Sequence, residues 1–242
     1  MRGELRSLTR SVLFTLAMAL ALPQAVDAAP RKRPAPARAA AVVPPSPTVA
    51  ALARWAVGSG DAQGLPFVIV DKEAARVFAY DARGAPMGQA PALLGVARGD
   101  HSAPGVGDRE LSDIPPEDRT TPAGRFVASY GPAAGGGQVL WVDYGAAISL
   151  HPLAPMSPKE RRPQRLASAT PLDNRITFGC INVPKAFYDK VVRPAFKGSP
   201  GDGKGVVYVL PDTLDLAEVF PAFAAQASQE LPGDEARIAA AH

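Results

Sequence analysis

The chain's only cysteine, Cys180, is the residue most suited to covalent chemistry. It follows Gly179 within Arg-Ile-Thr-Phe-Gly-Cys-Ile-Asn (175–182) and comes shortly before a helical pattern. A thiol at a glycine turn can be exposed and can lie beside backbone N–H groups, which favour the thiolate and can later hold an oxyanion. The alternative is a buried cysteine that packs as a small hydrophobe.

A cysteine nucleophile needs a base within hydrogen-bond reach. Of the three histidines, His242 is the last residue and His101 lies in a long loop. His151 ends an apolar run and precedes Pro152, which terminates strand pairing. We therefore predict a Cys180–His151 pair, with a solvated strand-edge histidine as the alternative. The histidines are too scattered, and the cysteine too isolated, for a zinc site, so we expect neither metal nor cofactor.

Short β-favouring runs dominate the chain around these residues. They cover 67–70, 76–80, 92–96, 124–130, 139–144, 146–150 and 205–210. One helix is predicted over 184–196, with Asn182 as a candidate cap and Pro184 in its first turn. The pattern favours a mainly β domain: a sandwich or partly closed barrel of short strands, with one packed helix following the cysteine.

Residues 1–28 are typical of a secretory signal, because a basic start is followed by an apolar run and small residues. The apolar run over 12–22 is short of the roughly 20 residues that a membrane-spanning helix needs, so a membrane anchor is the less favoured alternative. We predict a signal peptide (1–28), a disordered Pro/Ala/Arg-rich linker (29–49), a short helix and lead-in (50–64), a catalytic domain (65–212) and a weakly helical or disordered tail (213–242).

The net charge of +3 does not indicate a nucleic-acid partner. Residues 1–28 carry a net +1 and residues 30–38 a net +4, which leaves −2 for the rest of the chain. The folded part therefore has no sustained basic stripe. A long segment rich in Gly, Pro and Asp, 98–121, is predicted to be a lid or binding loop.

The residues around the cysteine resemble the signature of the L,D-transpeptidase catalytic domain family, which has the YkuD fold. That signature has a first histidine, an intervening stretch and then Ser/Thr-His-Gly-Cys-hydrophobic-Asn. The matching residues are His151, then Thr177, Gly179, Cys180, Ile181 and Asn182 in order. A Thr-Pro-x-Gly-x-Phe element common in the family resembles 121–126, and the resemblance covers about residues 66–211.

Two features depart from the family pattern. Phe178 stands where the family has a histidine, two residues before the cysteine. The 25 residues between His151 and Thr177 are also more than usual, and 155–175 has the character of an Arg-rich insertion. We interpret this insertion as a solvated loop, with a rim that grips acidic peptide stems as the alternative.

The resemblance implies an exported, cell-wall-associated enzyme whose substrates are peptidoglycan peptide stems. Cys180 would form a thioester with a tetrapeptide stem and His151 would act as its base. Gly179 would contribute to the oxyanion site, Thr177 and Asn182 would shape the loop, and Arg175 would contact a stem carboxylate. The acceptor would be an amine of a neighbouring stem or of a cell-wall-attached protein. Only the export signal would contact the membrane.

Two alternatives stay open at this point. The thioester could pass to water, which would make the chain a carboxypeptidase or amidase. The loss of the histidine at Phe178 could instead leave a non-catalytic wall-binding module.

Overall fold

The computed structural model describes residues 43–133, 135–153 and 157–230. The predicted signal peptide, the greater part of the predicted linker and the last twelve residues lie outside this description. Within the described residues, no helix is long and apolar enough to cross a membrane.

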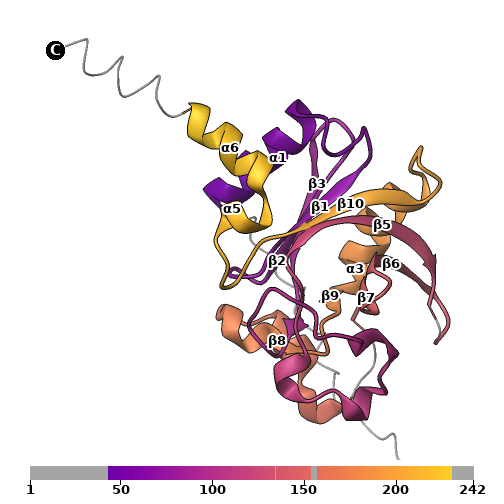
Figure 1. Cartoon of the computed structure of the whole chain (residues 1–242). Coiled ribbons are helices and arrows are strands. Elements are labelled where there is room, and N and C mark those ends of the chain that lie inside the picture. Colours follow the sequence, from indigo (N-terminus) through magenta and orange to yellow (C-terminus); the bar gives the residue numbers. More distant parts are fainter. Residues whose placement is uncertain (1–42, 134, 154–156, 231–242) are drawn as a thin grey trace, which may run out of the picture. The chain divides into compact units, whose positions relative to one another are not determined.

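Eight strands form one mixed sheet in the order β3-β2-β1-β10-β5-β6-β7-β9. The strands are β1 (Phe67–Asp71), β2 (Arg76–Tyr80), β3 (Pro86–Pro91), β5 (Gly124–Pro132), β6 (Gln138–Asp143), β7 (Ile148–Pro152), β9 (Ile181–Val183) and β10 (Lys204–Val209). The sheet curls into a nearly closed barrel (Figure 1). The predicted fold class, mainly β with a partly closed barrel, is therefore confirmed.

Most neighbouring strands are antiparallel, but β1 pairs with β10 and β7 with β9 in parallel. Two short strands, β4 (Leu94–Gly95) and β8 (Arg175–Thr177), pair in parallel as a separate two-stranded sheet. Strands β3, β8 and β9 were not predicted. Strand β3 has a proline at each end and the other two have three residues each, so none of them has a clear strand pattern.

The central strands are buried on both faces because each face meets a different hydrophobic cluster. In β1, Val68 and Val70 belong to one cluster, while Phe67 and Ile69 point into the other. This follows from the alternation of side chains along a strand. The second cluster is covered by α1 (Pro47–Gly58), α5 (Leu216–Val219) and α6 (Pro221–Glu230) (Figure 1).

The helix after the cysteine packs against the first cluster, as expected. It consists of α3 (Lys185–Phe187), a π-helical turn (Tyr188–Val192) and α4 (Arg193–Lys197). Pro194 explains the irregular middle, because proline has no N–H to donate to the carbonyl four residues earlier. The expectation that Asn182 caps this helix is wrong: Pro184 is the N-cap, no side chain caps it, and the Asn182 side chain bonds elsewhere.

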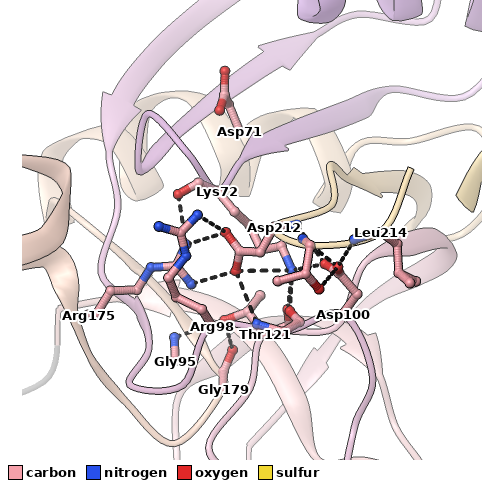
Figure 2. A network of polar contacts seen from close by, with 12 residues as sticks. Asp71, Lys72, Gly95, Arg98, Asp100, Thr121, Arg175, Gly179, Asp212 and Leu214 are labelled. Atoms are coloured by element: carbon pink, nitrogen blue, oxygen red, sulfur yellow. Dashed lines mark hydrogen bonds and ion pairs between the residues drawn. The ribbon is translucent and has the colours of Figure 1, made fainter. Parts of the chain in front are cut away.

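The 98–121 segment contains three short 3₁₀ turns, at Val106–Asp108, Leu111–Asp113 and Pro116–Asp118. Its two ends are held by Lys72, which is only 1% exposed. Lys72 Nζ donates to Gly99 O at 2.6 Å, to Asp100 Oδ1 at 2.7 Å and to Thr121 O at 2.9 Å (Figure 2). All three donors of the ammonium group are therefore used.

Two further ion pairs complete this group of buried charges (Figure 2). Arg175 donates to both carboxylate oxygens of Asp212, at 2.9 and 2.6 Å. Lys72 Nζ lies 3.5 Å from Asp212 Oδ2, and Asp100 accepts the backbone N–H groups of residues 212, 213 and 214. We call Lys72, Asp100, Asp212 and Arg175 the lysine cluster.

Candidate active site

The turn that carries the cysteine joins β8 to β9 and is closed by the Thr177 side chain. Thr177 Oγ1 donates to Cys180 O at 2.7 Å and accepts from Gly179 N at 3.2 Å. Thr177 is 2% exposed, so water does not compete for these bonds. Because the Gly179 amide is used inside the turn, the amide of Cys180 is the better candidate to hold an oxyanion.

Gly179 is required by both its conformation and its surroundings. Its φ of +123° is one that side-chain-bearing residues rarely adopt. A Cβ there would lie 2.6 Å from Ile148 Cδ1 and 2.7 Å from Thr120 O. Thr121 Oγ1 also donates to Gly179 O at 2.7 Å, so the end of the 98–121 segment packs directly on the cysteine turn.

Parallel pairing of β7 with β9 brings the candidate base to the cysteine. In this register His151 is opposite Asn182 and Leu150 is opposite Ile181. Cys180 immediately precedes β9, so the turn meets the end of β7 where His151 lies. The structure thus brings together two residues that have the whole Arg-rich segment, 155–175, between them in the chain.

Cys180 is half-buried, and its sulfur has polar neighbours. Ser149 Oγ lies 3.7 Å from Sγ, and Sγ donates to Ala147 O at 3.6 Å. The sequence analysis did not identify Ser149. The signal was available, because residues two apart on a strand share a face and Ser149 precedes His151 by two.

Cys180 and His151 shift each other's pKa towards the charged forms. Burial raises the pKa of Cys180, but the hydrogen bond and positive charge of His151, together with contacts from Ser149, outweigh it and lower the pKa. Burial lowers the pKa of His151, but interaction with Cys180 and the Pro152 carbonyl raises it overall, while Arg162 acts in the opposite direction. The arrangement favours a nucleophilic sulfur beside a group that can exchange its proton.

Both ring nitrogens of His151 have a partner. Nδ1 lies 2.9 Å from Pro152 O, and Nε2 lies 2.9 Å from Nδ2 of Asn182. Asn182 Oδ1 in turn accepts from Arg162 Nη1 at 2.6 Å. We call Cys180, His151, Asn182 and Arg162, in that order of contact, the cysteine cluster. Arg162 was predicted to lie in a solvated loop, and no local pattern marks it as buried.

Phe178, two residues before the cysteine, is half-buried beneath an arginine. The Arg119 guanidinium lies 4.0 Å from the centre of the Phe178 ring, within cation–π range. The Arg119 side chain also donates through Nε to Ile114 O at 2.8 Å. A cation contributed by the 98–121 segment therefore sits beside the cysteine turn.

Arg175, predicted to contact a stem carboxylate, has its guanidinium engaged within the protein. It is bonded to Asp212 and to Lys72 O, and its side chain is 9% exposed. These contacts make it part of the lysine cluster, and they count against a role in binding substrate. Within the described residues, no group of three or more His, Cys, Asp or Glu side chains could hold a metal ion.

Comparison with known proteins finds similarity at the level of structure. No protein-family model matches the chain, and no curated protein matches it. Among solved structures, LD transpeptidase LdtMt1 in complex with imipenem is similar, with a TM-score of 0.32 and 17% identity over 60% of this chain. The match spans 58% of that protein. A similarity of this extent does not by itself establish a shared activity.

Proposed function

We propose that this chain is a peptidoglycan L,D-transpeptidase that works through a thioester on Cys180. The observation that carries the proposal is the parallel pairing of β7 with β9, which brings His151 to the turn that holds the lone thiol. The lowered pKa of Cys180 and the raised pKa of His151 agree with it. The resemblance of 121–126 and of the cysteine turn to the family signature supplies the substrate class.

In the first step the thiol proton passes to His151 and the sulfur attacks the carbonyl carbon of the third stem residue. The amide of Cys180 stabilises the oxyanion. The C–N bond to the terminal D-alanine then breaks, and the departing amine takes a proton from His151. An acceptor amine then attacks the thioester carbon and gives a proton to His151. The C–S bond breaks, which yields the cross-link, and the sulfur leaves as a thiolate that can take the proton back from His151.

The acceptor in this proposal is an amine of a neighbouring stem, and the enzyme works after export, at the cell wall. The residues of the Cys180 turn are compatible with transfer of the acyl group to either an amine or water. Measuring the products therefore decides the acceptor. Purified stems should give a cross-linked dimer, whereas shortened stems alone would replace the transferase with a carboxypeptidase.

The experiment for thioester formation is intact-mass measurement after incubation with a carbapenem. Attack of the sulfur on the β-lactam carbonyl opens the ring without a leaving group, so the protein should gain the whole mass of the drug. Cys180→Ala should show no gain. Ser59→Ala should react like the unaltered chain, because Ser59 is exposed at the end of α1. No gain in the unaltered chain would favour a non-catalytic wall-binding module.

A further inference from the structure

Arg162 is a buried charged residue for which the proposed reaction has no direct use. It begins the short helix α2 (Arg162–Leu166), inside the Arg-rich segment, and is 6% exposed. A buried guanidinium must be paired, because an unpaired buried charge is strongly destabilising. Its partners are Glu160 Oε2 at 2.5 Å and Asn182 Oδ1 at 2.6 Å.

The contact with Arg162 fixes the orientation of the Asn182 amide. Guanidinium nitrogens only donate, so the amide oxygen, not its nitrogen, must face Arg162. The amide NH₂ therefore faces His151 and donates to Nε2 at 2.9 Å. If the amide were turned over, two donors would meet at Arg162, which its burial does not permit.

The amide orientation in turn determines the tautomer of His151. Nε2 accepts from Asn182, so in the neutral ring Nε2 carries no proton. Pro152 O can only accept, so Nδ1 carries the proton and donates to it across 2.9 Å. The lone pair that can receive the thiol proton is thus on Nε2.

We propose that Arg162 is a positioning residue for the Cys180–His151 pair: through the Asn182 amide it keeps Nε2 of His151 without a proton and able to accept one from the thiol. This inference rests on the proposed function for its catalytic meaning. In the step itself the S–H bond breaks and an N–H bond forms at Nε2, so the Asn182 NH₂ group loses its acceptor and must move away from the new N–H group.

The charge of Arg162 acts in the same direction as the amide. The charges of Cys180 and Arg162 both act on the ring, and Arg162 is itself paired with Glu160. Cys180 raises the pKa of His151, whereas Arg162 lowers it. Without Arg162 the amide can also turn its oxygen towards an Nε2–H group. Both changes favour imidazolium, so the pKa of His151 should rise further.

The test is ¹⁵N NMR of histidine-labelled full chain, without substrate. Above its titration midpoint, His151 of the unaltered protein should be the Nδ1–H tautomer. In Arg162→Met the Nε2–H form should appear, the His151 midpoint should move to higher pH, and alkylation of Cys180 by iodoacetamide should begin at lower pH. The matched control is Arg161→Met, which removes the same charge from an adjacent exposed side chain and should change none of these.

A folded Arg162→Met protein with an unchanged tautomer and His151 midpoint would overturn the inference, as would an Nε2–H ring in the unaltered chain. If Arg162→Met does not fold, Asn182→Asp serves instead. The carboxylate still accepts from Arg162 but cannot donate to Nε2, so the His151 midpoint must rise; an unchanged midpoint also overturns the inference. These measurements need no peptide stem, so a failure of carbapenem acylation with the expected tautomer would reject the transpeptidase alone.

Discussion

The cysteine cluster and the lysine cluster both bury polar and charged side chains, but only one of them leaves a proton free to move. In the lysine cluster each donor of Lys72 has an acceptor within 2.9 Å, and both carboxylates are paired. In the cysteine cluster the sulfur contacts Ala147 O at 3.6 Å and Ser149 Oγ at 3.7 Å, which are longer distances than those of the Lys72 bonds. A saturated cluster gives rigidity, whereas an unsaturated one permits chemistry.

The two clusters are connected through short stretches of backbone. Thr121 O accepts from Lys72, and Thr121 Oγ1 donates to Gly179 O. Strand β8 also has Arg175 of the lysine cluster at one end and Thr177 of the cysteine turn at the other. The rigid cluster therefore supports the turn on which the reactive sulfur lies.

Of the substitutions that distinguish the two clusters, His151→Gln should have the largest effect, and that effect should be on the reaction rate. Loss of the general base should lower the rate of carbapenem acylation by about 10²- to 10⁴-fold. The free energy of unfolding should change by only about 1 kcal/mol, because glutamine retains one hydrogen-bonding side chain. Timed intact-mass measurements and urea denaturation would give both values. An acylation rate within twofold of the unaltered chain would remove His151 from the proposed mechanism.

Lys72→Met should have the reverse profile, with a large effect on stability. Removing the buried ammonium leaves the Asp100 and Asp212 carboxylates short of a partner, which should lower the free energy of unfolding by about 3–5 kcal/mol. Lys185→Met is the matched control, since Lys185 is exposed and should change it by within about 0.5 kcal/mol. Equal urea midpoints for the two variants would contradict a structural role for the lysine cluster.

The pH dependence of the free energy of unfolding gives a second test of the structural role of the lysine cluster. Burial raises the pKa of Asp100, but Lys72 and the hydrogen bonds from residues 212–214 outweigh it and hold the pKa well below its usual range. A depressed folded pKa stabilises above the unfolded value of about 4, and this contribution is lost as the pH falls through the folded pKa. The stability difference between the unaltered chain and Asp100→Asn should thus be constant from pH 5 to about 7 and shrink in acid. A difference that grows below pH 4 would contradict this.

Ser149→Ala should have the smallest effect of the four. Ser149 helps to lower the pKa of Cys180, and without its hydroxyl that pKa should rise. Iodoacetamide alkylation would then begin at higher pH, with a stability change of about 0.5–1.5 kcal/mol. The exposed Ser112→Ala serves as control. A shift to lower pH in Ser149→Ala would mean that the hydroxyl does not favour the thiolate.

The strand runs and the cysteine turn could be read from the sequence because their signals are local. Short runs of β-favouring residues predicted β1, β2 and β10, and Gly179 before Cys180 predicted a turn. Lys72 shows what local signals miss. Between Asp71 and Glu73 it has the pattern of an exposed turn residue, yet it is buried and donates to acceptors that lie 27 to 49 positions further along the chain. No local pattern carries that information.

By itself the sequence determined which residues could react, since a lone thiol after glycine and a histidine at a strand end are features of composition and short-range pattern. The tertiary structure alone decided their surroundings. Parallel pairing of β7 with β9 placed His151 beside the cysteine turn, directed Asn182 to the imidazole instead of a helix end, and buried Arg162 behind it. Such contacts depend on strand register and on long-range packing, and neighbouring residues in the chain do not encode them.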